Sequence, residues 1–157
     1  MSDKILEVSD LQIRYVTDEE TVRADNGVSF TLERGESIGL VGETGAGKTT
    51  TALGIMGLVP DPPGEIVGGS ILFENQDLLK LPEKQMREIR GGKISMIFQD
   101  PMTSLNPVMT VGAQIAEVVL LHNKISKAEA RERAKEMLEQ VGIPGSRCDD
   151  YPHQFSG

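Results

Sequence analysis

The sequence predicts an α/β fold with an antiparallel β part near its N-terminus and a helical segment toward its C-terminus. Three observations support this prediction. Apolar and polar residues alternate in two stretches before residue 33, as they do in half-buried strands. A continuous apolar run then leads into a glycine-rich loop and a helical pattern, which is the order of elements in α/β domains. After residue 125, apolar residues recur at helical spacing.

Two strands come first along the chain. The alternation over 11–15 marks one strand and the alternation over 28–32 marks the other. The segment between them is charged and contains Asn26 followed by Gly27, a frequent turn signal. We therefore expect the two strands to pair antiparallel.

The middle of the chain is expected to alternate strands with helices. Short apolar runs predict strands, proline and glycine predict loops, and a proline at the first position favours a helix start. In chain order the expected elements are a buried strand over 37–41, a helix with Ala52, Ile55 and Met56 on its apolar face, a loop over 58–69, a strand over 70–74, a helix over 82–90 and a strand over 93–98.

The last third predicts an amphipathic helix. Ser126 and Glu129 have the spacing of a capping box, in which each side chain binds the other residue's backbone N–H group. Apolar residues then recur at helical spacing as far as Val141, and Gly142 supplies a stop signal. The charged opposite face is expected to lie in water.

Composition excludes several classes of function. The chain has 157 residues, of which 38% are hydrophobic and 25% are charged, as in ordinary soluble domains. A formal net charge of -8 argues against nucleic acid as a partner. The sequence has no signal-peptide pattern and no membrane-length apolar run, so we expect a cytosolic location. Cys148 is expected to be a free thiol, and the isolated His122 and His153 predict no metal site.

The clearest motif is GETGAGKT over residues 42–49, which fits the pattern G-x-x-x-x-G-K-[ST]. Its glycines allow successive N–H groups to point at phosphate oxygens, and the following helix adds its positive end. We expect Lys48 to reach the β and γ phosphates of a nucleotide and the Thr49 hydroxyl to ligate Mg²⁺. The predicted nucleotide-binding residues are Gly42, Glu43, Thr44, Gly45, Ala46, Gly47, Lys48, Thr49 and Thr50.

The motif alone leaves the class of P-loop protein open. A guanine-specific enzyme is expected to carry an Asn-Lys-x-Asp segment, and the sequence has Asn-Lys-Ile-Ser at 123–126. Guanine selectivity is therefore not supported. Small-molecule kinases remain possible on the P-loop alone.

Longer stretches resemble one family, the ATP-binding subunits of ABC transporters, and within it those of oligopeptide and dipeptide importers. The resemblance runs from Ile5 to Gly157. Its most specific stretches are GVSFTLERGESIGLVGETGAGKTTTALGIMGL, IFQDPMTSLNPVMTVGAQIAE, SKAEARERAKEMLEQVGIP and YPHQFSG. It implies a P-loop NTPase core of the ABC ATPase type, with ATP and Mg²⁺ as cofactors. Residues 1–100 would hold the β part and the P-loop core, and residues 101–157 would begin the helical subdomain.

The resemblance assigns roles to residues outside the loop. Tyr15 falls where the family places an aromatic residue that stacks on adenine, although a strand residue here could also simply pack on the core. Gln99 falls where the family's glutamine contacts Mg²⁺ and the attacking water, in a loop that docks on the membrane subunit. Phe155, Ser156 and Gly157 resemble the start of the signature motif, through which Ser156 and Gly157 would contact ATP on a second subunit.

The resemblance also implies that the core is incomplete within residues 1–157. The family places the Walker B aspartate, the catalytic glutamate and the switch histidine after the signature. We therefore expect a fragment of a longer subunit, or a truncated gene product, that does not hydrolyse ATP by itself. Between the strands at 37–41 and 93–98 we expect a gap in the parallel sheet, with exposed apolar edges.

The expected function is to power import of peptides across the cytoplasmic membrane. The implied partners are a second ATP-binding subunit, identical or different, and the transmembrane permease subunits, which would hold the chain at the inner face of the membrane. Nickel and glutathione importers look similar over these residues, so the solute stays open. The alternatives are a nucleotide-binding or permease-docking module without hydrolysis, and a small-molecule kinase.

Overall fold

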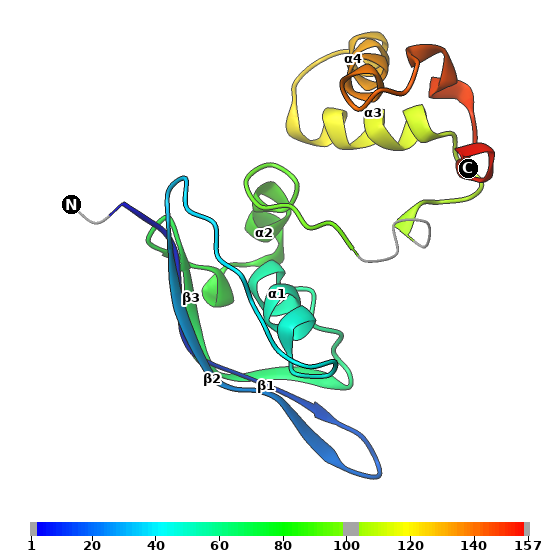
Figure 1. Ribbon diagram of the computed structural model, residues 1–157. Helices are drawn as coiled ribbons and strands as arrows, with labels where there is room; N and C mark the ends of the chain where they lie inside the picture. Colours follow the sequence, from blue (N-terminus) through cyan, green and yellow to red (C-terminus); the bar gives the residue numbers. More distant parts are fainter. Residues whose placement is uncertain (1–2, 99–103, 156–157) are drawn as a thin grey trace. The chain divides into compact units, whose positions relative to one another are not determined.

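The computed structural model describes residues 3–98 and 104–155 (Figure 1). Its internal contacts divide the chain into two compact units, Met1–Arg90 and Gly91–Gly157. The first unit holds a sheet and two helices, and the second unit is helical. Within the described ranges, no helix has the length and apolar character that crossing a membrane requires.

The sheet of the first unit has four strands in the order β2-β1-β3-β4, and each neighbouring pair is antiparallel. The predicted antiparallel pairing of the first two strands is therefore confirmed. The strands extend much further than the alternating patterns on which they were predicted, because each gains hydrogen bonds along its whole length from a neighbour. Their bounds are Lys4–Val16 for β1, Thr21–Glu33 for β2, Gly64–Phe73 for β3 and Gln76–Asp77 for β4.

The turn expected at Asn26 and Gly27 is wrong, because both residues lie inside β2. The chain turns earlier, where the Glu20 N–H donates to the Thr17 hydroxyl at 3.1 Å and the Thr17 N–H donates to the Glu20 carbonyl at 2.9 Å. Gly27, with a φ of 87°, coincides with a shift in register against β1. Such a bulge accommodates one extra residue, and glycine tolerates its left-handed backbone.

The loop expected over 58–69 is also partly wrong, because β3 already begins at Gly64. Gly69 in this stretch allows β3 and β1 to approach each other closely. A β-carbon on Gly69, whose φ is 93°, would lie 2.5 Å from the Asp10 carbonyl oxygen of β1. Glycine in a strand can mark such an approach as well as a loop.

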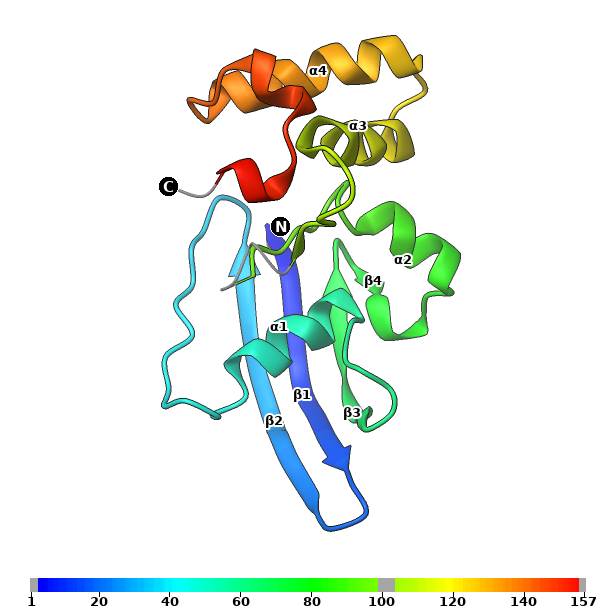
Figure 2. The same ribbon diagram turned by 90° about the vertical axis from the view of Figure 1, so that its right-hand side faces the viewer.

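Two helices complete the first unit, as predicted. The face predicted for the first helix is partly wrong, because its buried residues are Thr51, Gly54 and Met56, whereas Ala52 and Ile55 are only half-buried. Helix α1 spans Lys48–Met56 and lies against one face of the sheet, as Figure 2 shows. Gly54 permits the close packing, because a β-carbon there would lie 2.8 Å from Ile13 Cδ1. Helix α2 spans Glu83–Ile89 and follows a 3-10 turn over Leu78–Lys80. The buried apolar residues of this unit are Val8, Leu11, Ile13, Met56, Ile71, Phe73, Leu78, Met86 and Ile89.

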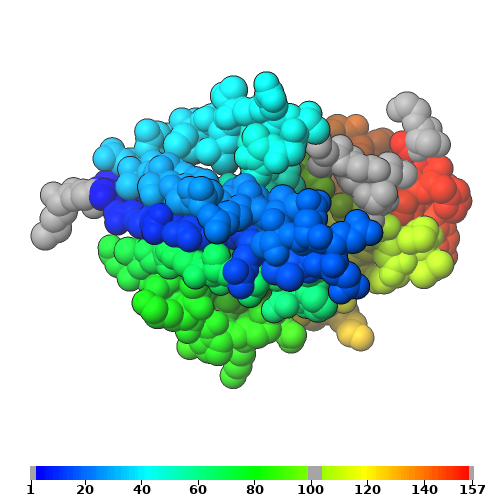
Figure 3. Space-filling model, turned by 90° about the horizontal axis from the view of Figure 1, so that it is seen from below, coloured from blue at the N-terminus to red at the C-terminus, as the bar shows by residue number. Residues whose placement is uncertain are grey.

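The two strands predicted over 37–41 and 93–98 are wrong. Residues 36–43 and 95–98 have no regular secondary structure, and 97% of Val41 and 94% of Ile97 are exposed. Figure 3 shows the segment before α1, in cyan, at the surface of the first unit. A parallel strand takes its hydrogen bonds from neighbours that are distant in sequence. Among the residues described, neither segment has such a neighbour. Exposed apolar side chains follow, as expected.

The described part of the second unit includes helix α3, Val111–His122, helix α4, Lys127–Gln140, and 3-10 turns at Gly145–Asp149 and Pro152–Phe155. The predicted capping box at Ser126 and Glu129 is confirmed at the start of α4. Cys148 is a free, buried thiol. It packs so closely on α3 that a β-carbon on Gly112 would lie 1.8 Å from its sulfur. The core of this unit is formed by Ala134, Leu138 and Cys148 with Val111, Ile115, Ala116 and Ile143 packed around them.

Candidate nucleotide-binding site

The glycine-rich loop turns sharply just before α1. Gly45 and Gly47 have φ angles of 87° and 82°, which are left-handed and favour glycine. The Ala46 N–H donates to the Glu43 carbonyl at 3.1 Å, which closes the turn. Gly47 is the N-cap residue of α1 and supplies no side-chain cap. The first N–H groups of the helix are therefore presented at the loop, where helices bind anions.

Lys48 folds back over this loop. Its ammonium group donates to the Gly42 carbonyl at 2.6 Å and to the Glu43 carbonyl at 2.7 Å. Both carbonyls belong to the loop that the motif defines, so the positive charge is already held beside the N–H groups. Thr49 is exposed on the first turn of α1. The loop, the lysine and this hydroxyl together suit a phosphate chain with an attached cation.

Tyr15 lies beside α1, although it belongs to β1 and precedes the loop by 27 residues. Its hydroxyl is 3.5 Å from the Thr50 hydroxyl. Its half-buried ring lies next to Gly64, where an added β-carbon would be 2.8 Å from Tyr15 Cε1. The fold therefore brings Tyr15 to the helix that carries Lys48 and Thr49.

Gln99, Ser156 and Gly157 lie outside the described residues. The segment before Ser156 is described as far as Phe155. Arg147 holds this segment, donating to the Asp150 carboxylate at 2.8 Å and to the Gln154 carbonyl at 2.7 Å. Its guanidinium also lies 4.1 Å from the centre of the Phe155 ring, a cation–π contact.

A buried polar pair behind the loop escaped the sequence analysis. The Thr51 hydroxyl lies 3.0 and 3.1 Å from the two carboxylate oxygens of Asp25, and both residues are almost completely buried. Burial raises the pKa of Asp25, and the hydrogen bond from Thr51 lowers it in part. The alternation over 28–32 extrapolates to inward positions at 26 and 24. The bulge at Gly27 shifts that phase and turns Asp25 inward. A glycine in a strand pattern was the only available signal.

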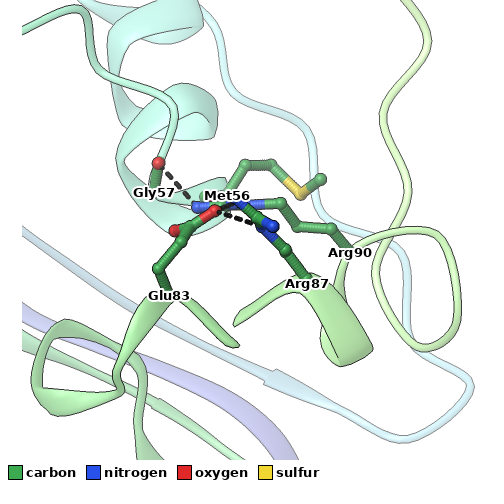
Figure 4. A network of polar contacts seen from close by, with 5 residues as sticks. All are labelled: Met56, Gly57, Glu83, Arg87 and Arg90. Carbon is green, nitrogen blue, oxygen red and sulfur yellow. Dashed lines mark hydrogen bonds and ion pairs between the residues drawn. The ribbon is translucent and has the colours of Figure 1, made fainter. Parts of the chain in front are cut away.

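Arg90 also escaped the sequence analysis, and it secures the other end of α1 (Figure 4). Its guanidinium donates to the Met56 carbonyl at 2.6 Å and to the Gly57 carbonyl at 2.8 Å. Glu83 accepts from the same guanidinium at 2.8 Å, and this contact lowers the pKa of Glu83. A cation at the C-terminus of a helix satisfies its last carbonyls and complements the helix dipole.

Comparison with known proteins shows a consistent set of relatives. The chain is 51% identical to the probable peptide ABC transporter ATP-binding protein y4tR of Sinorhizobium fredii (strain NBRC 101917 / NGR234), over 99% of this chain and 47% of that protein. It is 53% identical to the oligopeptide transport ATP-binding protein OppD of Bacillus subtilis (strain 168), over 98% of this chain and 44% of that protein. The chain thus spans less than half the length of these relatives.

The fold agrees with the sequence relatives. The structure matches the ATP-binding cassette MJ0796, solved as a dimer in a post-hydrolysis state bound to ADP and Pi, with a TM-score of 0.82 and 24% identity. The match covers 96% of this chain and 63% of that chain, and at this identity it shows the fold alone. The predicted ABC ATPase fold class is thereby confirmed. The family model described as ABC transporter matches residues 26–157. The chain therefore belongs to the ABC transporter family, as part of its ATP-binding domain.

Proposed function

We propose that the loop over residues 42–50 binds the phosphate chain of ATP. The observation that carries this proposal is the arrangement of two left-handed glycines, an uncapped helix start and the Lys48 ammonium in one turn of chain. On binding, Lys48 would exchange its two loop carbonyls for phosphate oxygens. Thr49 would ligate the Mg²⁺ that accompanies ATP, because its hydroxyl lies on the exposed first turn of α1.

Tyr15 would support the adenine ring. Its hydroxyl lies within 3.5 Å of Thr50, and its ring is only half-buried. The face of the Tyr15 ring would therefore stack on a base, while the ring edge at Cε1 contacts Gly64. Base stacking on an aromatic ring contributes about 1–3 kcal/mol.

The remaining site roles come from the family. We propose that Gln99 contacts Mg²⁺ and the attacking water, and that Ser156 and Gly157 contact ATP held by a second ATP-binding subunit. The contacts of Arg147 support the last role, because they fix the chain immediately before residue 156. Residues 101–157 would then belong to a helical subdomain, and residues 1–100 to the β part and P-loop core.

The whole subunit would power import of peptides. The relatives named above are peptide and oligopeptide transport proteins, which supports this substrate class over nickel or glutathione. Its partners would be a second ATP-binding subunit and the transmembrane permease subunits, which would hold it at the cytoplasmic face of the membrane. The family assignment also favours this role over a small-molecule kinase.

Residues 1–157 alone would bind ATP without useful turnover. Phosphoryl transfer in P-loop proteins uses a Walker B aspartate and a residue that positions water, besides the loop. Of the groups that hold Mg²⁺ or position the water, we assign only Thr49, the hydroxyl of the loop, and Gln99. Phosphate release by residues 1–157 should therefore equal the background without protein. Turnover that disappears in Lys48→Ala would contradict this part of the proposal.

Calorimetric titration with Mg-ATP tests the binding proposal. Lys48→Ala should abolish most of the affinity, whereas Lys84→Ala, which removes an exposed lysine of α2, should leave it unchanged. Tyr15→Ala should weaken binding by about 1–3 kcal/mol, and Tyr15→Phe should retain most of it because the ring remains. Equal affinity of the wild type and Lys48→Ala would overturn the assignment of the loop.

A further inference from the structure

Asp25 and Thr51 form a buried polar contact in the otherwise apolar interface between β2 and α1. Asp25 is 4% exposed and Thr51 is 3% exposed. Isolated buried carboxyl groups are unfavourable, so a carboxyl kept at such a position needs a partner. Across β1 the position opposite Asp25 is the apolar Ile13, which leaves the Thr51 hydroxyl as its polar contact from the helix. Nearby, Lys48 directs its charge to Gly42 and Glu43.

The hydroxyl of Thr51 also reaches the loop. It lies 3.1 Å from the Gly47 carbonyl oxygen, which accepts the Thr51 N–H at 2.8 Å as well. A hydroxyl carries one hydrogen and two lone pairs, so it can donate to Gly47 while it accepts from another group. The Thr51 hydroxyl donates to the carboxylate when Asp25 is ionised. When the carboxyl bears a proton, it donates to Thr51, and the Thr51 hydroxyl then donates to the Gly47 carbonyl. In both states Asp25 orients the Thr51 hydroxyl beside Gly47.

The carboxyl also limits the loop from the other side. A β-carbon on Gly47 would lie 2.4 Å from Asp25 Oδ1 and 2.4 Å from the Ala24 carbonyl oxygen. The Gly47 carbonyl thus accepts a hydrogen bond from Thr51, and the Gly47 α-carbon lies in close contact with β2. The N–H groups that follow Gly47 belong to the first turn of α1, beside the proposed phosphate site.

We propose that Asp25 is a positioning residue for the phosphate-binding loop, acting through Thr51 to fix the Gly47 peptide and so the affinity of the loop for the phosphate chain of a nucleotide. This inference rests on the proposed binding of ATP. Asp25 touches no nucleotide in this arrangement. Its effect should therefore depend on the number of phosphates in the ligand and be absent for the base.

Three variants separate positioning from mere packing. Asp25→Leu keeps the branched shape without polar atoms, Thr51→Val removes only the hydroxyl, and Asp25→Asn keeps a donor for Thr51 without charge. The first two should weaken Mg-ATP binding about fivefold to tenfold, the scale of one hydrogen bond, whereas Asp25→Asn should stay within about twofold. Ile13→Val is the matched control, because it trims the same contact between sheet and helix without touching the loop.

Titration calorimetry with Mg-ATP and with adenosine, beside urea unfolding of each variant, gives the decisive comparison. Loss of Mg-ATP affinity in Asp25→Leu and Thr51→Val, with rescue in Asp25→Asn and unchanged adenosine binding, would support the proposal. Affinities that equal the wild type would overturn it. So would losses that follow stability alone and appear equally in Ile13→Val.

Failure of the proposed function would be visible separately. If the wild type does not bind Mg-ATP, the nucleotide assignment fails, and hydrogen exchange of the amides at 44–48 without nucleotide then tests the positioning role. Faster exchange in Asp25→Leu and Thr51→Val than in Ile13→Val would support it. Equal exchange in all three would overturn it.

Discussion

Strand β1 and the segment over 37–41 are both rich in apolar residues but have opposite environments. Ile13 of β1 is completely buried, whereas 97% of Val41 is exposed. Strand β1 has a hydrogen-bonded neighbour on each side, and the nearer one, β2, follows it after a four-residue turn. An apolar run therefore becomes a buried strand only where the fold supplies partners for its backbone.

The largest expected difference between these regions is in stability. Ile13→Ala should lower the free energy of unfolding by about 2–5 kcal/mol, because it leaves a cavity between β1 and α1. Val41→Ala should change it by less than about 0.5 kcal/mol, because the side chain loses few contacts. Urea unfolding followed by circular dichroism measures both values. Similar losses in the two variants would show that residues 37–41 pack on a core.

The next effect lies at the junction between the buried and exposed regions. Gly45→Ala should cost about 1–2 kcal/mol of stability, because this position is left-handed, as is Gly47. Gly47→Ala should cost distinctly more, since its β-carbon would overlap the Ala24 carbonyl while Gly45 faces open space. The same unfolding measurement compares them. A larger loss in Gly45→Ala would mean that Gly47 does not touch β2.

The far end of α1 offers a smaller test. Arg90→Ala should lower the free energy of unfolding by about 1–2 kcal/mol, because the Met56 and Gly57 carbonyls lose a charged donor. Arg87→Ala is the matched control. The Arg87 guanidinium pairs with Glu83 at 3.3 Å on the surface, so its loss should have little effect. Thermal unfolding of the two variants checks the difference. Equal effects would exclude Arg90 as a cap of α1.

The smallest expected effect depends on pH. Burial raises the pKa of Asp25 above its unfolded value of 3.8, so the folded chain retains a proton that the unfolded chain has lost. Stability contributed by this group should therefore fall as pH rises from about 4 through the folded pKa. Asp25→Asn lacks this loss, so its stability relative to the wild type should rise over the same window. Urea unfolding at a series of pH values tests the sign, and a relative stability that falls with pH would contradict it.

Much of the fold follows from local patterns. The capping box at Ser126 and the stop at Gly142 place α4 within a residue or two, and the glycine-rich motif places α1. Strand pairing was predicted for β1 and β2 because they are neighbours in sequence. The bulge at Gly27 was mistaken for a turn, because an Asn-Gly pair has the same appearance in both.

The candidate site divides in the same way. Lys48 and Thr49 were predicted from the motif, because a phosphate loop is a continuous stretch whose residues act through their own backbone. Asp25 could not be predicted, because the bulge at Gly27 decides on which face of β2 its side chain lies. Arg90 could not be predicted, because its contacts are at the end of α1, far from it in sequence. Tyr15 was assigned through a family resemblance, and only the fold shows that it reaches Thr50.

By itself, the sequence determined the phosphate loop, the helices α1, α2 and α4, and the family. These depend on interactions within a few residues or on motifs that can be read directly. The tertiary structure decided which apolar runs become strands, which carboxyl is buried behind the loop and what holds α1 at its end. These contacts join residues 26 and 34 positions apart, as in Thr51 with Asp25 and Arg90 with Met56. The free energy of burial depends on which distant side chains meet, and no local pattern encodes that meeting.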